Sequence, residues 1–101
     1  MQIISGTQNN EATLTLSGRF DFNTHRDFRG SYETLLAGGG INRIILDMQG
    51  VDYLDSSALG MLLFLNEKAG ASNIKIMISR PQSNVLQILE IANFNKLFTI
   101  S

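Results

Sequence analysis

The sequence contains no cysteine and no tryptophan, and it has a single proline and a single histidine. Without cysteine, disulfides, zinc–thiolate sites and cysteine nucleophiles are excluded. Long apolar runs are also missing, because the longest, from Ala58 to Leu65, is far shorter than the roughly 20 residues that span a bilayer. The first residues lack the basic and apolar segments of a signal peptide. These absences predict a cytoplasmic protein that does not insert into a membrane.

Charge of neither sign dominates the composition. Lysine and arginine number 8 and aspartate and glutamate 9, for a formal net charge of -1. This balance excludes a strongly basic nucleic-acid-binding surface and an acidic disordered tail. The 101 residues, 44% of them hydrophobic, suffice for one domain with an ordinary core. No linker, repeat or low-complexity tract divides the chain, so we expect a single domain over residues 1–101.

Hydrophobic periodicity predicts an alternation of strands and helices. Strands are expected over residues 2–7, 12–17, 41–48, 73–78 and 97–100. The first helix should start near Asn23 or Thr24 and end at the glycine run 38–40. The second helix should cover about residues 56–69 and end at Gly70. The third helix should start at Pro81 or Ser83. Residues 49–55 are expected to form a loop, and Gly18 to end the second strand.

The order β-β-α-β-α-β-α-β predicts an α/β fold. A short connection makes the first two strands an antiparallel hairpin, and strands separated by helices pair in parallel through right-handed crossovers. The result is a mixed β-sheet. The apolar run Ile44 to Leu46 predicts that the third strand is buried on both faces. The pattern alone does not say whether the helices cover one face of the sheet or both.

A segment rich in carboxylates and serines lies between the third strand and the second helix. Asp47, Asp52 and Asp55 fall within nine residues, and Ser56 and Ser57 follow at the helix start. One interpretation is helix capping by Asp55 or Ser56. The other is phosphorylation of Ser56, where free amides and the positive end of the helix would stabilise a phosphate that also faces the carboxylates. The residue types alone leave both interpretations open.

Three other chemistries are disfavoured. No Gly-x-Ser-x-Gly elbow surrounds Ser56, so a hydrolase triad with His25 lacks support, and we expect His25 to be exposed on the first turn of the first helix. The glycine run 38–40 lacks the spacing of a phosphate loop and precedes a strand. The three aspartates lack the ligand spacing of a calcium loop. We therefore expect no metal and no cofactor.

The second helix indicates a binding surface. Its buried face is expected to contain Leu59, Leu62, Leu63 and Ala69. Phe64 falls among charged residues on the opposite face, with Met61 at its edge, and is either incidental or an anchor for a partner. Phe22, in the loop after the second strand, is another candidate anchor, with a hydrophobic staple onto the first helix as the alternative.

Several segments resemble a known family. The run from Asp55 to Gly60, Asp-Ser-Ser-Ala-Leu-Gly, resembles the signature of STAS domains, most closely the single-domain anti-sigma-factor antagonists of bacteria. Residues 16–21 resemble the motif after that family's second strand, and residues 85–98 its third helix and the turn into the last strand. The resemblance covers nearly the whole chain and implies a STAS-like mixed sheet. The family's usual last helix is lacking, so an exposed edge could be covered by a partner or, as a homodimer, by a second copy.

The resemblance also implies roles for individual residues. In that family the first serine after the aspartate is phosphorylated, which maps to Ser56. The residues expected to shape this site are Asp21, Asp47, Asp52, Asp55, Ser57 and Gly60. The residues expected to bind a partner are Phe22, Asn23, Thr24, Met61 and Phe64.

The function implied by the resemblance is that of a non-enzymatic, phosphorylation-controlled protein switch in bacterial signal transduction and transcription regulation. The unphosphorylated form is expected to bind an anti-sigma factor or a related regulator with a serine-kinase domain. Phosphorylation of Ser56 from the partner's ATP would release the complex, and a metal-dependent serine phosphatase would reset it. No direct contact with nucleic acid is expected.

Two alternatives come from other functional classes. One is a structural STAS subunit of a membrane-transporter complex or signalling scaffold, in which the loop at Ser56 is only a docking surface. The other is a small-ligand or nucleotide-binding domain, or a hydrolase that uses Ser56. Absence of phosphorylation in cells would favour the first, and saturable ligand binding or turnover by the isolated chain would favour the second.

Overall fold

The computed structural model describes all 101 residues, and its N-terminal segment is a β-hairpin. Strands β1 (Gln2–Gln8) and β2 (Glu11–Phe20) pair antiparallel, with Gln8 opposite Glu11. The two residues between them, Asn9 and Asn10, both have positive φ angles, 53° and 67°, as a tight two-residue turn requires. The predicted hairpin is confirmed. Strand β2, however, does not end at Gly18 but continues to Phe20 through two register shifts.

The sheet has five strands in the order β1-β2-β3-β4-β5. Strands β3 (Arg43–Leu54), β4 (Lys75–Ser79) and β5 (Thr99–Ile100) each pair in parallel with the preceding strand. The predicted mixed sheet is therefore confirmed. The last strand is shorter than predicted, because Leu97 and Phe98 follow a 3₁₀ turn, η2 (Phe94–Lys96), before pairing starts.

Three α-helices connect the parallel strands: α1 (His25–Gly38), α2 (Ser56–Ala71) and α3 (Ser83–Ile91). Helix α1 begins directly after Thr24, one of the two predicted N-caps, although the Thr24 side chain makes no capping hydrogen bond; Phe22–Thr24 form a separate 3₁₀ turn, η1. Helix α1 ends at the glycine run as expected, with Gly39 at a φ of 66°. Helix α2 continues one residue past Gly70. None of the helices is both long and apolar enough to cross a membrane.

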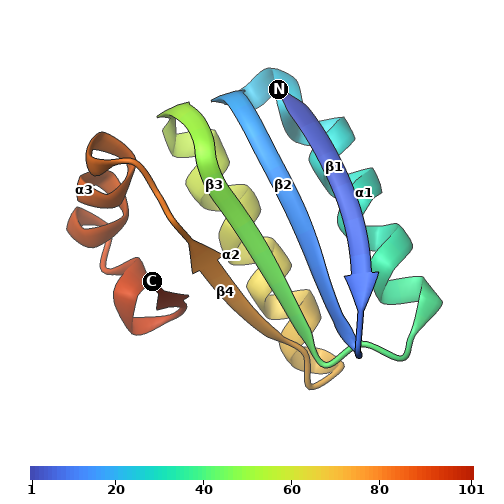
Figure 1. The fold of residues 1–101 in the computed structure, drawn as a ribbon. Helices are drawn as coiled ribbons and strands as arrows, with labels where there is room; N and C mark the ends of the chain where they lie inside the picture. The colour runs from blue at the N-terminus through green and yellow to red at the C-terminus, as the bar shows by residue number, and fades with distance from the viewer.

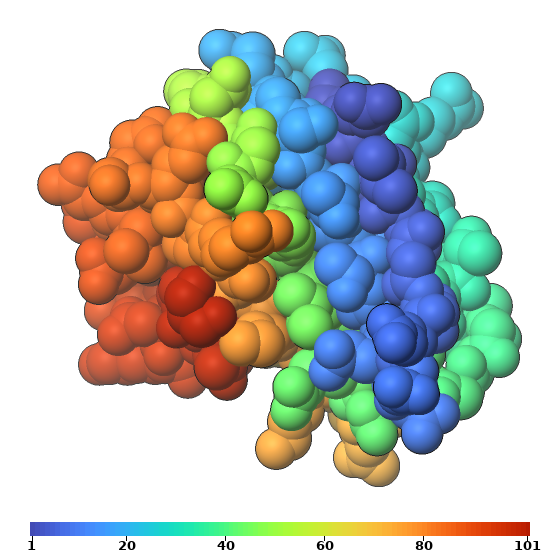
Figure 2. All heavy atoms as spheres, viewed as in Figure 1, coloured from blue at the N-terminus to red at the C-terminus, as the bar shows by residue number.

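The sheet carries α1 and α2 on one face and leaves its other face open (Figure 1). Figure 2 shows this open face, on which no helix lies over strands β1 to β3. Accordingly Ile44, Leu46 and Met48 of β3 are fully buried toward the helices, whereas Ile45 is only partly buried. The expectation that β3 is buried on both faces was wrong, because helices cover only one of them.

The core extends to the edge of the sheet where the parallel strands end. Phe20, at the end of β2, packs on Phe28 of α1 with ring centroids 4.8 Å apart, and Phe28 packs edge-on against Tyr32 at 5.4 Å. Phe20 and Phe28 are fully buried. This aromatic row fixes the start of α1 against the end of β2, and so positions the connection between them.

Candidate functional site

The β2–α1 and β3–α2 connections lie side by side because their strands are parallel neighbours. Phe20 is paired with Leu54 at the ends of β2 and β3, so Asp21 and Asp55 leave the sheet together. Residues 49–54, predicted as a loop, instead extend β3. They do so because β2 offers a partner strand along its whole length, which the glycine and aspartate of this segment do not reveal.

Asp55 joins the two connections. Its Oδ1 accepts a hydrogen bond from the N–H of Ala58 at 2.9 Å, which caps α2. Its Oδ2 accepts one from the N–H of Phe22 at 3.3 Å, in the other connection. Its own N–H donates to the carbonyl of Phe20 at 3.3 Å. Of the two capping candidates, Asp55 is therefore the cap.

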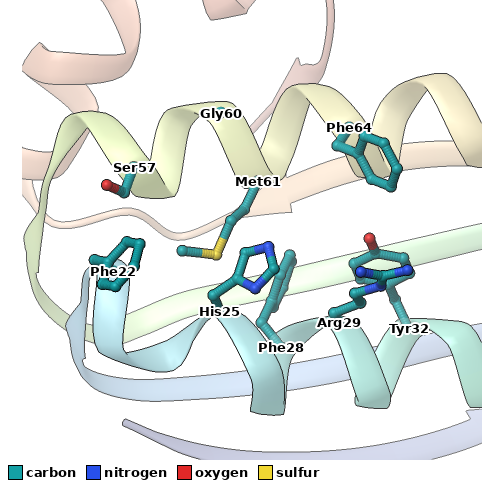
Figure 3. A pocket seen from close by; sticks show the side chains of 9 residues that line it. All are labelled: Phe22, His25, Phe28, Arg29, Tyr32, Ser57, Gly60, Met61 and Phe64. Carbon is teal, nitrogen blue, oxygen red and sulfur yellow. The ribbon is translucent and has the colours of Figure 1, made fainter.

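Ser56 is the first residue of α2 and is exposed. Its hydroxyl makes no hydrogen bond within the chain, since Asp55 already fulfils the capping role. Ser57, the next residue, is half-buried and turned toward α1 (Figure 3). No hydrogen bond connects His25, exposed at the start of α1 as predicted, to either serine. The arrangement provides an accessible hydroxyl at a helix N-terminus.

Asp21 organises the β2–α1 connection. Its Oδ1 accepts from the N–H of Asn23 at 3.0 Å, and its carbonyl accepts from the N–H and hydroxyl of Thr24 at 3.0 and 2.7 Å. The η1 turn is therefore held by Asp21, and Thr24 is buried. Phe22, at the start of this turn, is 72% exposed. A hydrophobic staple of Phe22 onto α1 is thus contradicted.

The structure brings some predicted residues together and separates others. Asp52 and Asp55 lie close to Ser56 in the chain, at the end of β3, and Asp52 is exposed. Asp47 instead lies seven residues before Leu54 along β3, roughly 23 Å away at about 3.3 Å per residue. There it pairs with Arg80 and accepts from the N–H of Gln49. Asp47 is therefore not at the site.

The predicted partner-binding residues differ in accessibility. Phe22, Asn23 and Phe64 are exposed, Phe64 at 46% as predicted. Thr24 and Met61 are buried, at 6% and 7%, so neither side chain stands out from the surface, although Met61 lines a groove between α1 and α2. The predicted face of α2 also needs correction at two positions. Leu63 is 42% exposed, while Leu65, on no predicted face, is fully buried.

Sequence reasoning missed an Arg–Tyr pair at the strand ends. The guanidinium of Arg19 lies 4.1 Å from the ring centroid of Tyr53. The two residues are paired near the end of the β2–β3 ladder. Arg19 also pairs with Asp21 at 3.6 Å. Their positions on adjacent parallel strands would have predicted this contact, had β3 been assigned to Leu54. No cluster of three or more acidic or histidine side chains converges as a metal site would require.

Comparisons with known proteins agree with this geometry. The family model described as STAS domain matches residues 2–101. A STAS-domain containing protein of Pseudomonas aeruginosa is 45% identical over 91 residues, which cover 90% of this chain and 88% of the relative.

Solved structures share the fold at low identity. The anti-sigma factor antagonist SpoIIAA in its unphosphorylated form superposes with a TM-score of 0.85 at 16% identity, covering 99% of this chain and 88% of that one. Its phosphorylated form, from Bacillus, gives 0.77 at 15%, with 99% and 91% coverage. The STAS domain of a SulP transporter from Vibrio cholerae gives 0.75 at 22%, with 95% and 77%. On the family model and the Pseudomonas relative together, the chain belongs to the STAS domain family.

Proposed function

We propose that this STAS domain is a protein-binding switch controlled by phosphorylation of Ser56. The observation that carries the proposal is that Ser56 is exposed at the first position of α2 while its hydroxyl is unused. If Ser56 capped α2, its hydroxyl would accept a hydrogen bond from an N–H of the helix. Asp55 accepts that hydrogen bond instead. The serine is therefore free to react without any loss of the helix cap.

The position of Ser56 suits a phosphate. The first N–H groups of a helix lack partners within the helix, and its positive end favours an anion. A phosphoserine carries about -1.5 to -2 charges at neutral pH. On this surface the charge adds to Asp52 and Asp55 at the same strand end. The modification changes the charge of the surface strongly and leaves the fold intact.

A partner would bind the face around Ser56 in the unphosphorylated state. Phe22 and Asn23 lie in the connection beside Ser56, and Phe64 lies about two turns further along α2; all three are exposed and supply apolar and polar contacts. The partner is an anti-sigma factor or related regulator with a serine-kinase domain, which transfers phosphate from ATP to Ser56 and is then released. A metal-dependent serine phosphatase resets the switch. The domain acts in the cytoplasm, catalyses no reaction and takes no cofactor.

The solved relatives are consistent with this proposal. SpoIIAA, whose fold this chain shares, has been solved in unphosphorylated and phosphorylated forms. The likeness to STAS domains of sulfate transporters favours a second candidate, a structural subunit that docks through the same surface without modification. The two candidates differ in whether the charge at position 56 controls binding.

Calorimetric titration against the co-encoded partner with a serine-kinase domain tests the proposal. Ser56→Ala should bind like the wild type and resist phosphorylation. Ser56→Asp should bind more weakly, because its charge must be desolvated against the partner. Phosphate should map to Ser56 rather than to half-buried Ser57. Equal affinity of all three proteins would favour the structural subunit, and phosphate on Ser57 would overturn the assignment.

A further inference from the structure

A groove runs between α1 and α2 on the outer side of the helical layer (Figure 3). Its volume is about 410 Å³. The residues that line it are Phe22, His25, Phe28, Arg29, Tyr32, Ser57, Gly60, Met61 and Phe64. Apart from Phe22 they occupy positions i, i+3, i+4 and i+7 on each helix: 25, 28, 29 and 32 on α1, and 57, 60, 61 and 64 on α2.

This spacing makes the groove straight and two helical turns long. Both helices link parallel strands and run in the same direction, with Phe22 and Ser57 at one end and Tyr32 and Phe64 at the other (Figure 3). Seven residues of helix rise about 10 Å. The side chains of α1 and α2 form two parallel ridges of this length. One further helix can pack between them, with its side chains in the groove.

The floor of the groove is apolar and its ends are aromatic. Phe28, Tyr32 and Met61 are at most 7% exposed, while Phe22 and Phe64 stand exposed at opposite ends. Unpartnered aromatic side chains around an apolar floor are typical of anchors for a bound protein segment.

Gly60 keeps the middle of the groove open. A Cβ placed there would meet no heavy atom within 4 Å, so packing within the chain does not require glycine. In a helix interior glycine is less favourable than alanine. The position thus leaves room for the side chain of another molecule at some cost to α2.

The charges around the groove favour an acidic occupant. The lining contains His25 and Arg29 and no carboxylate. Beyond it, Glu33 is shared by two cations, with Oε1 3.4 Å from Arg29 Nε and Oε2 3.5 Å from Lys68 Nζ. Lys68 also lies 5.3 Å from the ring centroid of Phe64. At the Phe22 end the positive ends of α1 and α2 lie beside the carboxylates of Asp21 and Asp55, so the positive side chains, Arg29 and Lys68, lie toward the Phe64 end.

We propose that this groove binds an amphipathic α-helix of the protein partner, with apolar side chains at i, i+3 or i+4, and i+7 and with acidic residues along its edges. Its acidic residues lie toward the Phe64 end, beside Arg29 and Lys68. This inference rests on the proposed function and adds a cause for release. A phosphate on Ser56 adds negative charge beside Asp52 and Asp55, at one end of a groove that holds an acidic helix.

Filling the groove tests the proposal. Gly60→Leu places a side chain in it, whereas Gly30→Leu, on α1, is a matched control, because a Cβ there also meets no atom within 4 Å and Gly30 does not line the groove. Titrated against the same co-encoded partner, Gly60→Leu should bind at least tenfold more weakly than wild type, and Gly30→Leu within twofold. Thermal melts confirm that both variants are folded.

The outcomes separate this inference from the proposed function. If the wild type binds and responds to Ser56→Asp, but both glycine variants bind equally well, the groove proposal is wrong and the switch stands. If the wild type does not bind, the proposed function itself fails. Equal weakening by both variants would also overturn the groove proposal.

Cross-linking identifies the occupant. With p-benzoylphenylalanine at position 64, irradiation of the complex should link the end of the groove to one helix of the partner, with acidic residues beside its apolar stripe. Linkage to a partner loop or strand, or to a second copy of this chain, would overturn the assignment of an acidic helix. A titration with dodecanoate gives a further test. If dodecanoate binds the wild type but not Gly60→Leu, and partner binding is unchanged in its presence, the groove holds a small amphipathic carboxylate and the assignment of an acidic helix is overturned.

Discussion

At the scale of single residues, Asp55 and Ser56 are neighbours with opposite roles. Both oxygens of Asp55 are engaged, one with α2 and one with the β2–α1 connection, whereas the hydroxyl of Ser56 is unengaged. Asp55→Ala should therefore lower the free energy of unfolding by about 1 to 2 kcal/mol, and Ser56→Ala by less than about 0.5 kcal/mol. Urea titrations measure both. A Ser56→Ala loss as large as that of Asp55→Ala would show that the hydroxyl caps the helix after all.

Tyr32, below the groove, makes stability depend on alkaline pH. Burial raises the pKa of Tyr32 above its usual 10.0, Glu33 raises it further, and Arg29 opposes them. The unfolded chain loses this proton at a lower pH than the folded one. The contribution of Tyr32 to the free energy of unfolding is therefore fully present below about pH 10 and is lost as the pH rises through the folded-state pKa. Tyr32→Phe should lose less stability than wild type between pH 9 and 11 in urea titrations. Parallel losses would contradict the raised pKa.

Residue roles could be predicted where they depend on a short run of sequence. Asp55, Ser56 and Ser57 are contiguous, so their positions at a helix start follow from that start alone. The distance of Asp47 from Ser56 depends instead on whether the residues between them form a loop or a strand. That is decided by pairing with β2, which the local sequence does not encode.

At the scale of elements, the end of β3 depends on a close approach at Gly50. A Cβ at this position would lie 2.8 Å from the Cβ of Ser17 and 3.1 Å from the carbonyl oxygen of Leu16, next to the register shift in β2. Gly50→Ala should destabilise the protein by about 1 to 3 kcal/mol through overpacking. Gly6→Ala, on β1, is the control, because a Cβ there meets nothing within 4 Å.

Denaturant titration of the two glycine variants decides this prediction. Ser17→Gly combined with Gly50→Ala should recover part of the loss, because it removes the nearer of the two clashes. An equal effect of Gly50→Ala and Gly6→Ala would show that only the strand propensity of the residue matters.

Helix α2 shows where periodicity fails. Leucine or phenylalanine occupies four consecutive positions, 62–65, so apolar residues lie on every side of the helix. The pattern correctly placed Leu62 in the core and Phe64 outside, but it placed the exposed Leu63 in the core and did not identify the buried Leu65. The choice is made by the sheet beneath the helix and by α1 beside it, neither of which is visible in the sequence of α2.

At the scale of the whole molecule, exposed aromatic side chains should contribute to binding rather than to stability. Phe22 and Phe64 lie at the two ends of the groove. Phe22→Ala and Phe64→Ala should each weaken partner binding by more than about 1 kcal/mol and change the free energy of unfolding by about 0.5 kcal/mol or less. Ile91→Ala, on α3, is the control, because Ile91 is 76% exposed away from this face.

Calorimetry and thermal melts on these three variants give both quantities. Weakening by Ile91→Ala alone would move the partner to the α3 side of the molecule.

The order of elements and the mixed sheet could be predicted because each strand and helix has a distinct periodicity. The one-sided layering could not, because either placement of the helices is compatible with the same pattern of apolar residues.

The strand order has a consequence for how the chain folds. Every strand pairs only with strands next to it in sequence, and the order in space is the order in the chain. No strand is inserted later between two that have already paired. Once the hairpin has formed, each following helix and strand finds the edge it needs already in place. The sheet can therefore be completed in the order in which the ribosome delivers it, growing from β1 outward.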